Sequence, residues 1–148
     1  MAISNDSEFK AALQGLSITQ QRQVAARFTE SVLALSADPR VAGAVNAAKR
    51  PDITDPELAA MYQAAKAATV ESYTQCGREC DWAAQAGHFV SKAATACVQP
   101  PDAATSLAWE AAMSARMARM SETVATGVGT ENSEAQEQYR ILGAFLNS

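Results

Sequence analysis

Apolar residues recur along the chain at the three- and four-residue spacing of α-helices, and no segment shows the strict alternation of a β-strand. Val24, Phe28, Val32 and Leu35 are one example, because spacings of four, four and three place them on a single helix face. β-branched residues never cluster. The pattern predicts an all-α fold, a compact bundle of about seven helices, at about 6–15, 18–36, 39–49, 56–76, 79–98, 102–124 and 133–146.

Helix starts are marked by residues suited to the unpaired N–H groups of a first turn. Three pairs have the spacing of a capping box: Asn5 with Glu8, Ser17 with Gln20, and Ser133 with Gln136. Three further positions place proline at a helix start, where no N–H is needed: Asp38-Pro39, Asp55-Pro56 and Pro100-Pro101-Asp102. These caps support the predicted boundaries.

Two later helices carry stripes of large side chains. One stripe comprises Trp82, Ala86, Phe89, Ala93 and Cys97, and the other comprises Trp109, Met113, Met117 and Met120. We expect both to face the core, with Phe28 and Trp82 as large core side chains, although methionines also suit an adaptable binding surface. The 79–98 helix has little polar surface, so we expect it near the centre. Tyr62 and Tyr73 share a face of the fourth helix, and we expect them in the core, with an interface as the alternative.

Alanine accounts for 33 of the 148 residues, whereas aromatic residues make up only 6%. Alanine is the best helix former, and a core built from its small side chain requires helix backbones to approach closely. A length of 148 residues is typical of a single domain, which we place at 1–148. Thr126-Gly127-Val128-Gly129 predicts a flexible 125–130 linker before the last helix.

Charge and composition exclude several classes of protein. Twelve Lys and Arg oppose 16 Asp and Glu, and Lys49-Arg50 is the only adjacent basic pair, so the chain lacks the concentrated basic face of a nucleic-acid binder. It has no apolar run long enough to span a membrane, and its start, MAISNDSEFK, is unlike a signal peptide. Three irregularly spaced cysteines indicate free thiols, and we expect a cytoplasmic location.

His88 is the only histidine, and Gly87 before it allows another backbone to come close. We interpret His88 as a helix-face residue that is hydrogen-bonded to a neighbour; a pH-sensitive or ligand-contacting residue is the alternative. No residue near it in sequence has the spacing of a catalytic partner, and no phosphate loop, zinc-protease motif or nucleophile elbow occurs. We therefore expect a protein without enzymatic activity.

Cys76 and Cys80 stand four residues apart, which would place them on one face of a continuous helix. Zinc and redox sites normally use C-x-x-C with further ligands, which this chain lacks. We expect structural thiols and neither metal nor cofactor; a thiol or metal site formed by Cys76, Cys80 and His88 is the alternative. Cys97 lies on an apolar stripe, where cysteine acts as a small hydrophobic residue.

Acidic residues bracket the glycine linker, namely Glu122, Glu131, Glu134 and Glu137. A patch of this kind suits a basic partner, and solvated helix ends explain it as well, because carboxylates are favourable near a helix N-terminus. Together with His88, the candidate partner-binding residues are Glu131, Glu134 and Glu137.

Residues 28–98 contain E-S-V-L-A-L, then D-P-R-V-A-G-A-V-N-A-A-K, and later W-A-A-Q-A-G-H-F-V-S-K-A-A-T-A-C-V. The order of these segments resembles that of the all-helical, alanine-rich immunity proteins of bacterial polymorphic-toxin systems. Gly87 and His88 match the A-G-H of that family, and residues 93–98 match most of the segment that follows. Cys97 stands where relatives often carry a further histidine, so any histidine cluster is lost here.

The resemblance implies a protein-binding module that neutralises a partner toxin, with His88 as a contact residue. Two other functions stay open: a homo-oligomeric helical scaffold or regulatory protein, such as a homodimer, and a thiol- or metal-binding bundle. A net charge of −4 also favours a basic protein partner, rather than nucleic acid or a membrane.

Overall fold

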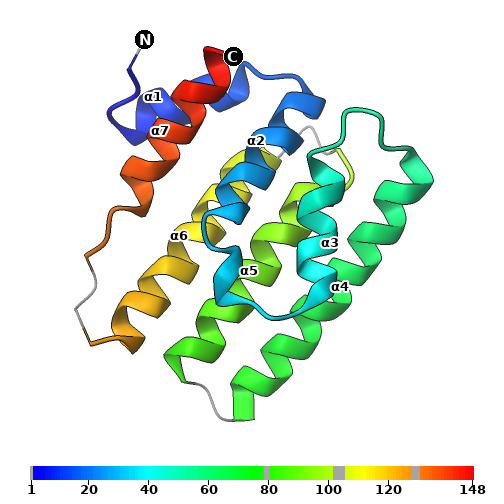
Figure 1. The fold of residues 1–148 in the computed structure, drawn as a ribbon, viewed down its shortest axis with the longest axis vertical. Coiled ribbons are helices and arrows are strands. Elements are labelled where there is room, and N and C mark those ends of the chain that lie inside the picture. Colours follow the sequence, from blue (N-terminus) through cyan, green and yellow to red (C-terminus); the bar gives the residue numbers. More distant parts are fainter. Residues whose placement is uncertain (1, 79–80, 102–105, 128–130) are drawn as a thin grey trace.

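The chain folds into seven α-helices and one short 3-10 helix in the residues that this computed structural model describes, which are 2–78, 81–101, 106–127 and 131–148, except for the side chains of 75–78. No strand occurs in these residues, so the predicted all-α bundle is confirmed (Figure 1). None of the described helices combines the length and hydropathy needed to cross a bilayer. The helices are α1 (Asp6–Gln14), α2 (Ile18–Glu30), α3 (Pro39–Ala48), α4 (Asp55–Arg78), α5 (Trp82–Val98), α6 (Leu107–Ala125) and α7 (Glu134–Leu146), with the 3-10 helix at Leu33–Leu35.

Three predicted helices are shorter than expected. The predicted 79–98 helix begins at Trp82, and residues 79–80 lie outside the described part. The predicted 18–36 helix stops at Glu30, and the chain then turns into the 3-10 helix. The helix predicted from residue 102 begins at Leu107, where Ser106 accepts a bond from the N–H of Trp109, and residues 102–105 lie outside the described part. The predicted linker is described only as far as 127, because 128–130 also lie outside it.

The predicted caps of the first two helices form. Ser17 and Gln20 make both bonds of a capping box. Asn5 accepts from the Glu8 N–H, whereas the Glu8 carboxylate bonds to Ser4 instead of returning to Asn5. Both helices therefore start where the sequence places them.

The predicted caps of α4 and α7 are wrong by one residue. Ser133 makes no capping bond, and Asn132 accepts from the Glu134 N–H in its place. Asp55 is already inside α4, which Thr54 caps in a reciprocal pair with Glu57. In each case the side chain one position earlier carries the acceptor that reaches the first turn.

α5 lies in the middle of the bundle, as its sequence predicts. It packs most extensively against α6, and against α4, α3 and α2 on its other sides (Figure 1). α1 and α7 meet at one end of the molecule, where both termini lie. Most residues of α5 are therefore buried or half-buried, except at its start.

The apolar stripe predicted on α2 lies in the core. Val24, Phe28 and Val32 are fully buried, and Leu35 of the 3-10 helix packs against them. The ring of Phe28 lies 5.4 Å from that of Phe9 on α1, measured between centroids. Phe28 is therefore the large core side chain that the sequence predicts.

Small side chains fill the core between α5 and α6. The fully buried residues of α6 are mostly alanines, and α5 adds more: Ala93, Ala94, Ala108, Ala111, Ala112, Ala115 and Ala118. Because each side chain is a single methyl group, the two backbones can approach closely and still exclude voids. We call this region the α5–α6 alanine contact.

The predicted methionine seam on α6 is wrong. Met117 is 39% exposed, and Trp109 and Met113 are half-buried at the edge of the core. The buried face of α6 belongs to the alanines instead. Large side chains on this helix therefore cover the edge of the alanine contact rather than forming it.

The helix α7 is held to the bundle by polar side chains as well as by Leu142. Glu134 is only 4% exposed, and its carboxylate accepts from Arg119 at 2.9 Å and from the Ser31 hydroxyl at 2.7 Å. Gln138 is fully buried and donates to the Ala112 carbonyl at 2.9 Å. We call these bonds of Glu134 and Gln138 the α7 attachment.

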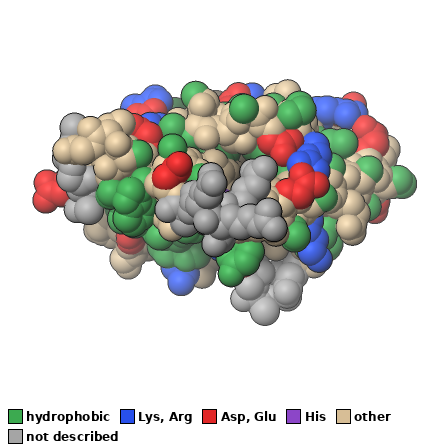
Figure 2. Space-filling view, turned by 90° about the horizontal axis from the view of Figure 1, so that it is seen from below, with side chains coloured by type: hydrophobic (Ala, Val, Ile, Leu, Met, Phe, Trp, Pro, Cys, Tyr) green, Lys and Arg blue, Asp and Glu red, His purple; other side chains and the backbone are tan. Residues whose placement is uncertain are grey.

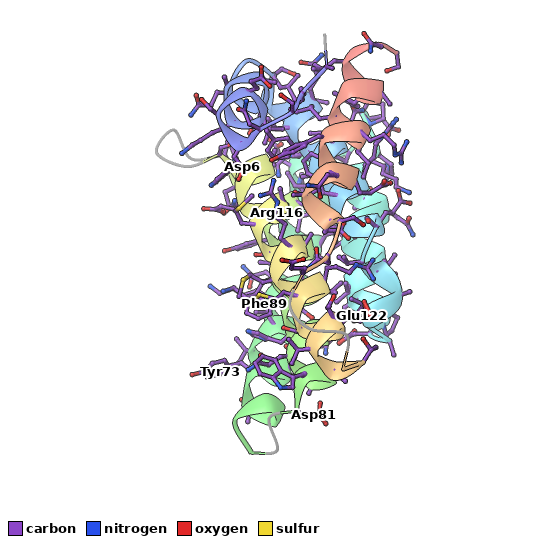
Figure 3. All side chains as sticks on the ribbon, turned by 90° about the vertical axis from the view of Figure 1, so that its left-hand side faces the viewer. Asp6, Tyr73, Asp81, Phe89, Arg116 and Glu122 are labelled. Atoms are coloured by element: carbon purple, nitrogen blue, oxygen red, sulfur yellow. The ribbon has the colours of Figure 1, made fainter. Side chains whose placement is uncertain are left out.

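Arg116 connects three helices at the end where the termini lie. Its guanidinium donates to the Gln138 amide on α7 at 2.8 Å and to both carboxylate oxygens of Asp6 on α1, at 3.0 and 2.8 Å (Figure 3). The Tyr139 hydroxyl donates to the same carboxylate at 2.8 Å. The Arg116 bond keeps the pKa of Asp6 below its usual range.

Arg22 on α2 reaches the last turn of α5. It is buried, and its guanidinium donates to the carbonyl of Cys97 at 2.9 Å. The last carbonyls of a helix lack partners within it and carry partial negative charge, so a buried cation is favourable there. The bond fixes α2 against the C-terminal end of α5.

Candidate partner-binding surface

His88 lies on the side of α5 that faces α4, and its ring orientation is fixed by hydrogen bonds. Nδ1 is 2.8 Å from the Ser72 hydroxyl oxygen, and that oxygen is 2.9 Å from the Thr69 carbonyl oxygen. The Ser72 hydroxyl can donate either to Nδ1 or to the Thr69 carbonyl, because both distances are those of a hydrogen bond. The predicted hydrogen-bonded helix-face histidine is confirmed.

The ring of His88 is held in its neutral form. Burial lowers its pKa, and the positive charge of Lys92 on the next turn of α5 lowers it further. In a nucleophilic serine–histidine pair, the serine hydroxyl donates to the histidine. The Ser72 hydroxyl also lies within bonding distance of the Thr69 carbonyl on its own helix, and its contact with His88 orients the imidazole.

Aromatic rings extend from His88 along the surface. The ring centroids of Tyr73 and Phe89 each lie 5.7 Å from that of His88. Trp82 is on the same face of α5 as Phe89, two turns earlier, and Figure 3 shows Tyr73 and Phe89 on one flank of the molecule. We call Tyr73, Trp82, His88 and Phe89 the aromatic surface.

Two of these residues correct the sequence prediction. Tyr73 is 68% exposed and Trp82 is 48% exposed, although both were expected in the core. Trp82 occupies the first position of α5, where no neighbour covers it fully. Figure 2 shows this end of the molecule, with hydrophobic side chains gathered beside the residues that are not described.

A pocket of about 370 Å³ adjoins the aromatic surface at His88. Gly87 forms part of its wall, and a Cβ at this position would lie 3.4 Å from the Leu35 carbonyl oxygen, so the predicted close approach of another backbone is confirmed. Ser72 also lines it. We call this cavity the His88 pocket. The remaining lining residues are Ser36, Ala37, Asp38, Ala68, Glu71, Ala83, Ala84 and Ser91.

Two carboxylates at the pocket share one arginine. Asp38 caps α3 as predicted, by accepting from the Arg40 N–H, and the Arg40 guanidinium lies 2.7 Å from Asp38 and 2.5 Å from Glu71 on α4. These bonds lower the pKa of both carboxyl groups, so both are ionised at neutral pH. Two negative charges and one positive charge leave a net charge of −1.

The acidic residues predicted for partner binding do not gather around His88. Glu134 is buried against Arg119 and Ser31, so it serves the α7 attachment and is not on an acidic surface. Glu137 pairs with Arg140 on its own helix, and Glu131 is exposed. Of the predicted binding residues, His88 alone adjoins the pocket.

Of the three cysteines, Cys97 is the one whose side chain the structure describes. Cys97 is fully buried, as predicted, and burial raises the pKa of its thiol to about 12. Its sulfur lies 3.3 Å from the Thr29 hydroxyl. The side chain of Cys76 and the whole of Cys80 lie outside the described residues. Within the described part of the chain, no three His, Cys, Asp or Glu residues are grouped to hold a metal.

Sequence reasoning missed the residues that complete the site. Ser72, Glu71 and Asp38 come from α4 and the start of α3, and only the packing of α4 against α3 and α5 brings them beside His88. The spacing of Thr69, Ser72 and Tyr73, at three and four residues, was the available signal of a common polar face on α4.

No family model matches the chain, and neither a curated protein nor a solved structure matches it. The class of this protein therefore follows from its fold and its site alone. This is an all-α bundle with an alanine-rich core, and it carries an aromatic surface beside an acidic pocket.

Proposed function

We propose that this chain is a non-catalytic protein-binding module of the bacterial cytoplasm, an immunity-type protein that neutralises a partner toxin by covering it. The observation that carries the proposal is the exposure of Tyr73 beside the ring of His88, and of Trp82 two turns before Phe89 on α5. Tyrosine and tryptophan are enriched among the residues that dominate binding energy in protein interfaces.

The position of the aromatic surface supports this proposal. Its residues lie on two packed helices, α4 and α5, so their backbones need little ordering when a partner binds. Neither Tyr73 nor Trp82 is required to fill the core, because both are largely exposed.

Co-expression with the product of the neighbouring gene tests the proposal. We expect the two proteins to co-purify, and we expect Tyr73→Ala and Trp82→Ala each to weaken binding at least about tenfold, as removal of a central aromatic residue does in other interfaces. Affinity is measured by calorimetry on purified proteins. The matched control is Met117→Ala, which removes an exposed large side chain from α6.

Retention of full affinity by both aromatic variants overturns the proposed surface. Equal losses in the Met117 variant overturn it as well, since the effect would then not be local. A neighbouring gene whose product does not bind the chain contradicts the immunity function itself.

A homo-oligomeric scaffold is the second candidate function, and one cavity favours it. A groove of about 440 Å³ runs between α4 and α6, with half-buried Tyr62, Trp109 and Met113 among its lining residues. Mass measurement in solution distinguishes the candidates. A strict monomer over a wide concentration range excludes the scaffold, whereas a dimer that Trp109→Ala dissociates supports it.

A further inference from the structure

We infer that the His88 pocket receives a cationic side chain, an arginine or a lysine, of the protein partner. The inference rests on the proposed function and adds the chemistry of the contact. It concerns the pocket, whereas the proposed function depends on the aromatic surface beside it, so the two can fail separately.

The charges around the pocket favour a cation. Among the described residues that line it, the charged side chains are Asp38 and Glu71, with no lysine or arginine. Arg40, which does not line the pocket, neutralises only one of the two carboxylates. Lys92 lies beyond the pocket, over the ring of Phe89 at 5.6 Å. The lining therefore presents net negative charge.

The hydrogen-bonding groups of the pocket favour the same ligand. Gly87 has no side chain to separate the pocket from the Leu35 carbonyl, and the carboxylates of Asp38 and Glu71 belong to the same lining. The neutral imidazole of His88 also lines the pocket and has one acceptor nitrogen in either tautomer. A guanidinium or ammonium group has donors only, so it matches a lining of carboxylates and a carbonyl.

The pocket is large enough for one long side chain. Its volume of about 370 Å³ is near the lower end of the range of small-ligand pockets, about 300–1,000 Å³. Another cavity on the molecule has a different balance of charged side chains. A cavity between α2, α3 and α7 is lined by Arg27, Lys49 and Glu30, so it offers a cation no net attraction.

The single histidine makes the test specific. We would follow the ring protons of His88 by NMR at neutral pH while adding N-acetylarginine amide, and then N-acetylcitrulline amide, which has nearly the same shape without the charge. We expect a saturable shift with the arginine compound only. Sodium chloride at matched ionic strength is the control for screening.

A matched pair of variants locates the binding. Glu71→Gln removes one charge from the pocket and leaves the Arg40–Asp38 pair, and we expect about threefold weaker binding, the effect of an exposed ion pair. Glu57→Gln is the control, because Glu57 also lies on α4 and pairs with an arginine, Arg50, away from the pocket. Circular dichroism confirms that both variants fold.

Three results overturn the inference. They are equal shifts with the arginine and citrulline compounds, no shift with either, and equal weakening by Glu71→Gln and Glu57→Gln. If any of these occurs while the partner still requires Tyr73 and Trp82, the proposed function stands and only the cationic contact is wrong.

Discussion

Alanines fill the contact between α5 and α6, whereas α7 is held to the bundle by a buried glutamate and a buried glutamine. Both regions connect one helix to the rest of the molecule and both exclude water. In the first, stability comes from many small contacts between closely spaced backbones. In the second, it comes from a few directed bonds, each of which requires its particular partner.

The difference predicts how each region fails. The α5–α6 alanine contact has no charge to titrate or screen, but it has no room for a larger side chain. The α7 attachment tolerates some change in volume, but loss of one partner leaves another polar group buried without a bond. The first region should therefore be sensitive to size and the second to charge.

The largest effect is expected at the apolar core beside both regions. Phe28→Ala removes a fully buried ring, and we expect the free energy of unfolding to fall by about 3–5 kcal/mol. Denaturant titration measures it. Retention of the full stability would contradict the placement of Phe28 and with it the position of α2.

Overfilling the alanine contact should have the next largest effect. Ala115→Leu inserts three carbon atoms at a fully buried position of α6, and we expect a loss of about 1–3 kcal/mol from strain. Ala125→Leu, at an exposed position on the same helix, is the matched control and should change little. Equal stability of the two variants would show that the contact has spare volume.

Removing the charge of the α7 attachment should have a somewhat smaller effect. Glu134→Gln keeps the shape of the side chain but weakens its bonds to Arg119 and Ser31, and we expect a loss of about 1–2 kcal/mol. The control is Glu137→Gln, whose partner Arg140 is exposed on the same helix, with an expected change within about 0.5 kcal/mol. Added salt should reduce the first difference if the contribution is electrostatic.

Protonation of His88 should have a smaller effect on the free energy of unfolding, and this effect depends on pH. The folded pKa of His88 is below the ordinary value of 6.5, so below that pH the unfolded chain binds more protons than the folded one. Stability is therefore complete above about pH 6.5 and falls as the pH decreases through the folded pKa.

A comparison of variants isolates this contribution. His88→Gln should lose the component of the pH dependence that begins below about pH 6.5, while the carboxylates Asp6 and Asp38 still act at lower pH. Denaturant titrations at several pH values measure the difference. Identical slopes for both proteins in this range would contradict the lowered pKa.

The smallest effect on stability is expected for Trp82. Because its side chain is 48% exposed, Trp82→Ala should change the free energy of unfolding by no more than about 0.5 kcal/mol. The same denaturant titration as for Phe28→Ala provides the measurement. A loss as large as that of Phe28 would restore Trp82 to the core and remove the aromatic surface from the proposal.

The fold follows from local sequence wherever one helix face is clearly apolar. The spacing of Val24, Phe28 and Val32 predicted their burial correctly, and Ser17 with Gln20 predicted a helix start correctly. These signals act within a few turns of chain, so no knowledge of the neighbours is required.

The candidate site depended on contacts between distant parts of the chain. Glu134 is buried because Arg119 and Ser31 meet it, and they lie 15 and 103 residues away in sequence. Met117 is exposed because alanines occupy the buried side of α6, and alanine gives too weak a hydrophobic signal to mark that side in advance. Hydrophobic periodicity alone therefore favoured the wrong face.

The bond from Arg22 to the Cys97 carbonyl makes the two ends of α5 unequal. Helix ends ordinarily fray, and their amide protons then exchange rapidly with deuterium from the solvent. In α5 the final turn is closed by a buried guanidinium, whereas the first turn begins at the exposed Trp82 and is capped by the exposed Asp81. We therefore expect slower exchange in the final turn than in the first turn, which carries part of the proposed partner-binding surface.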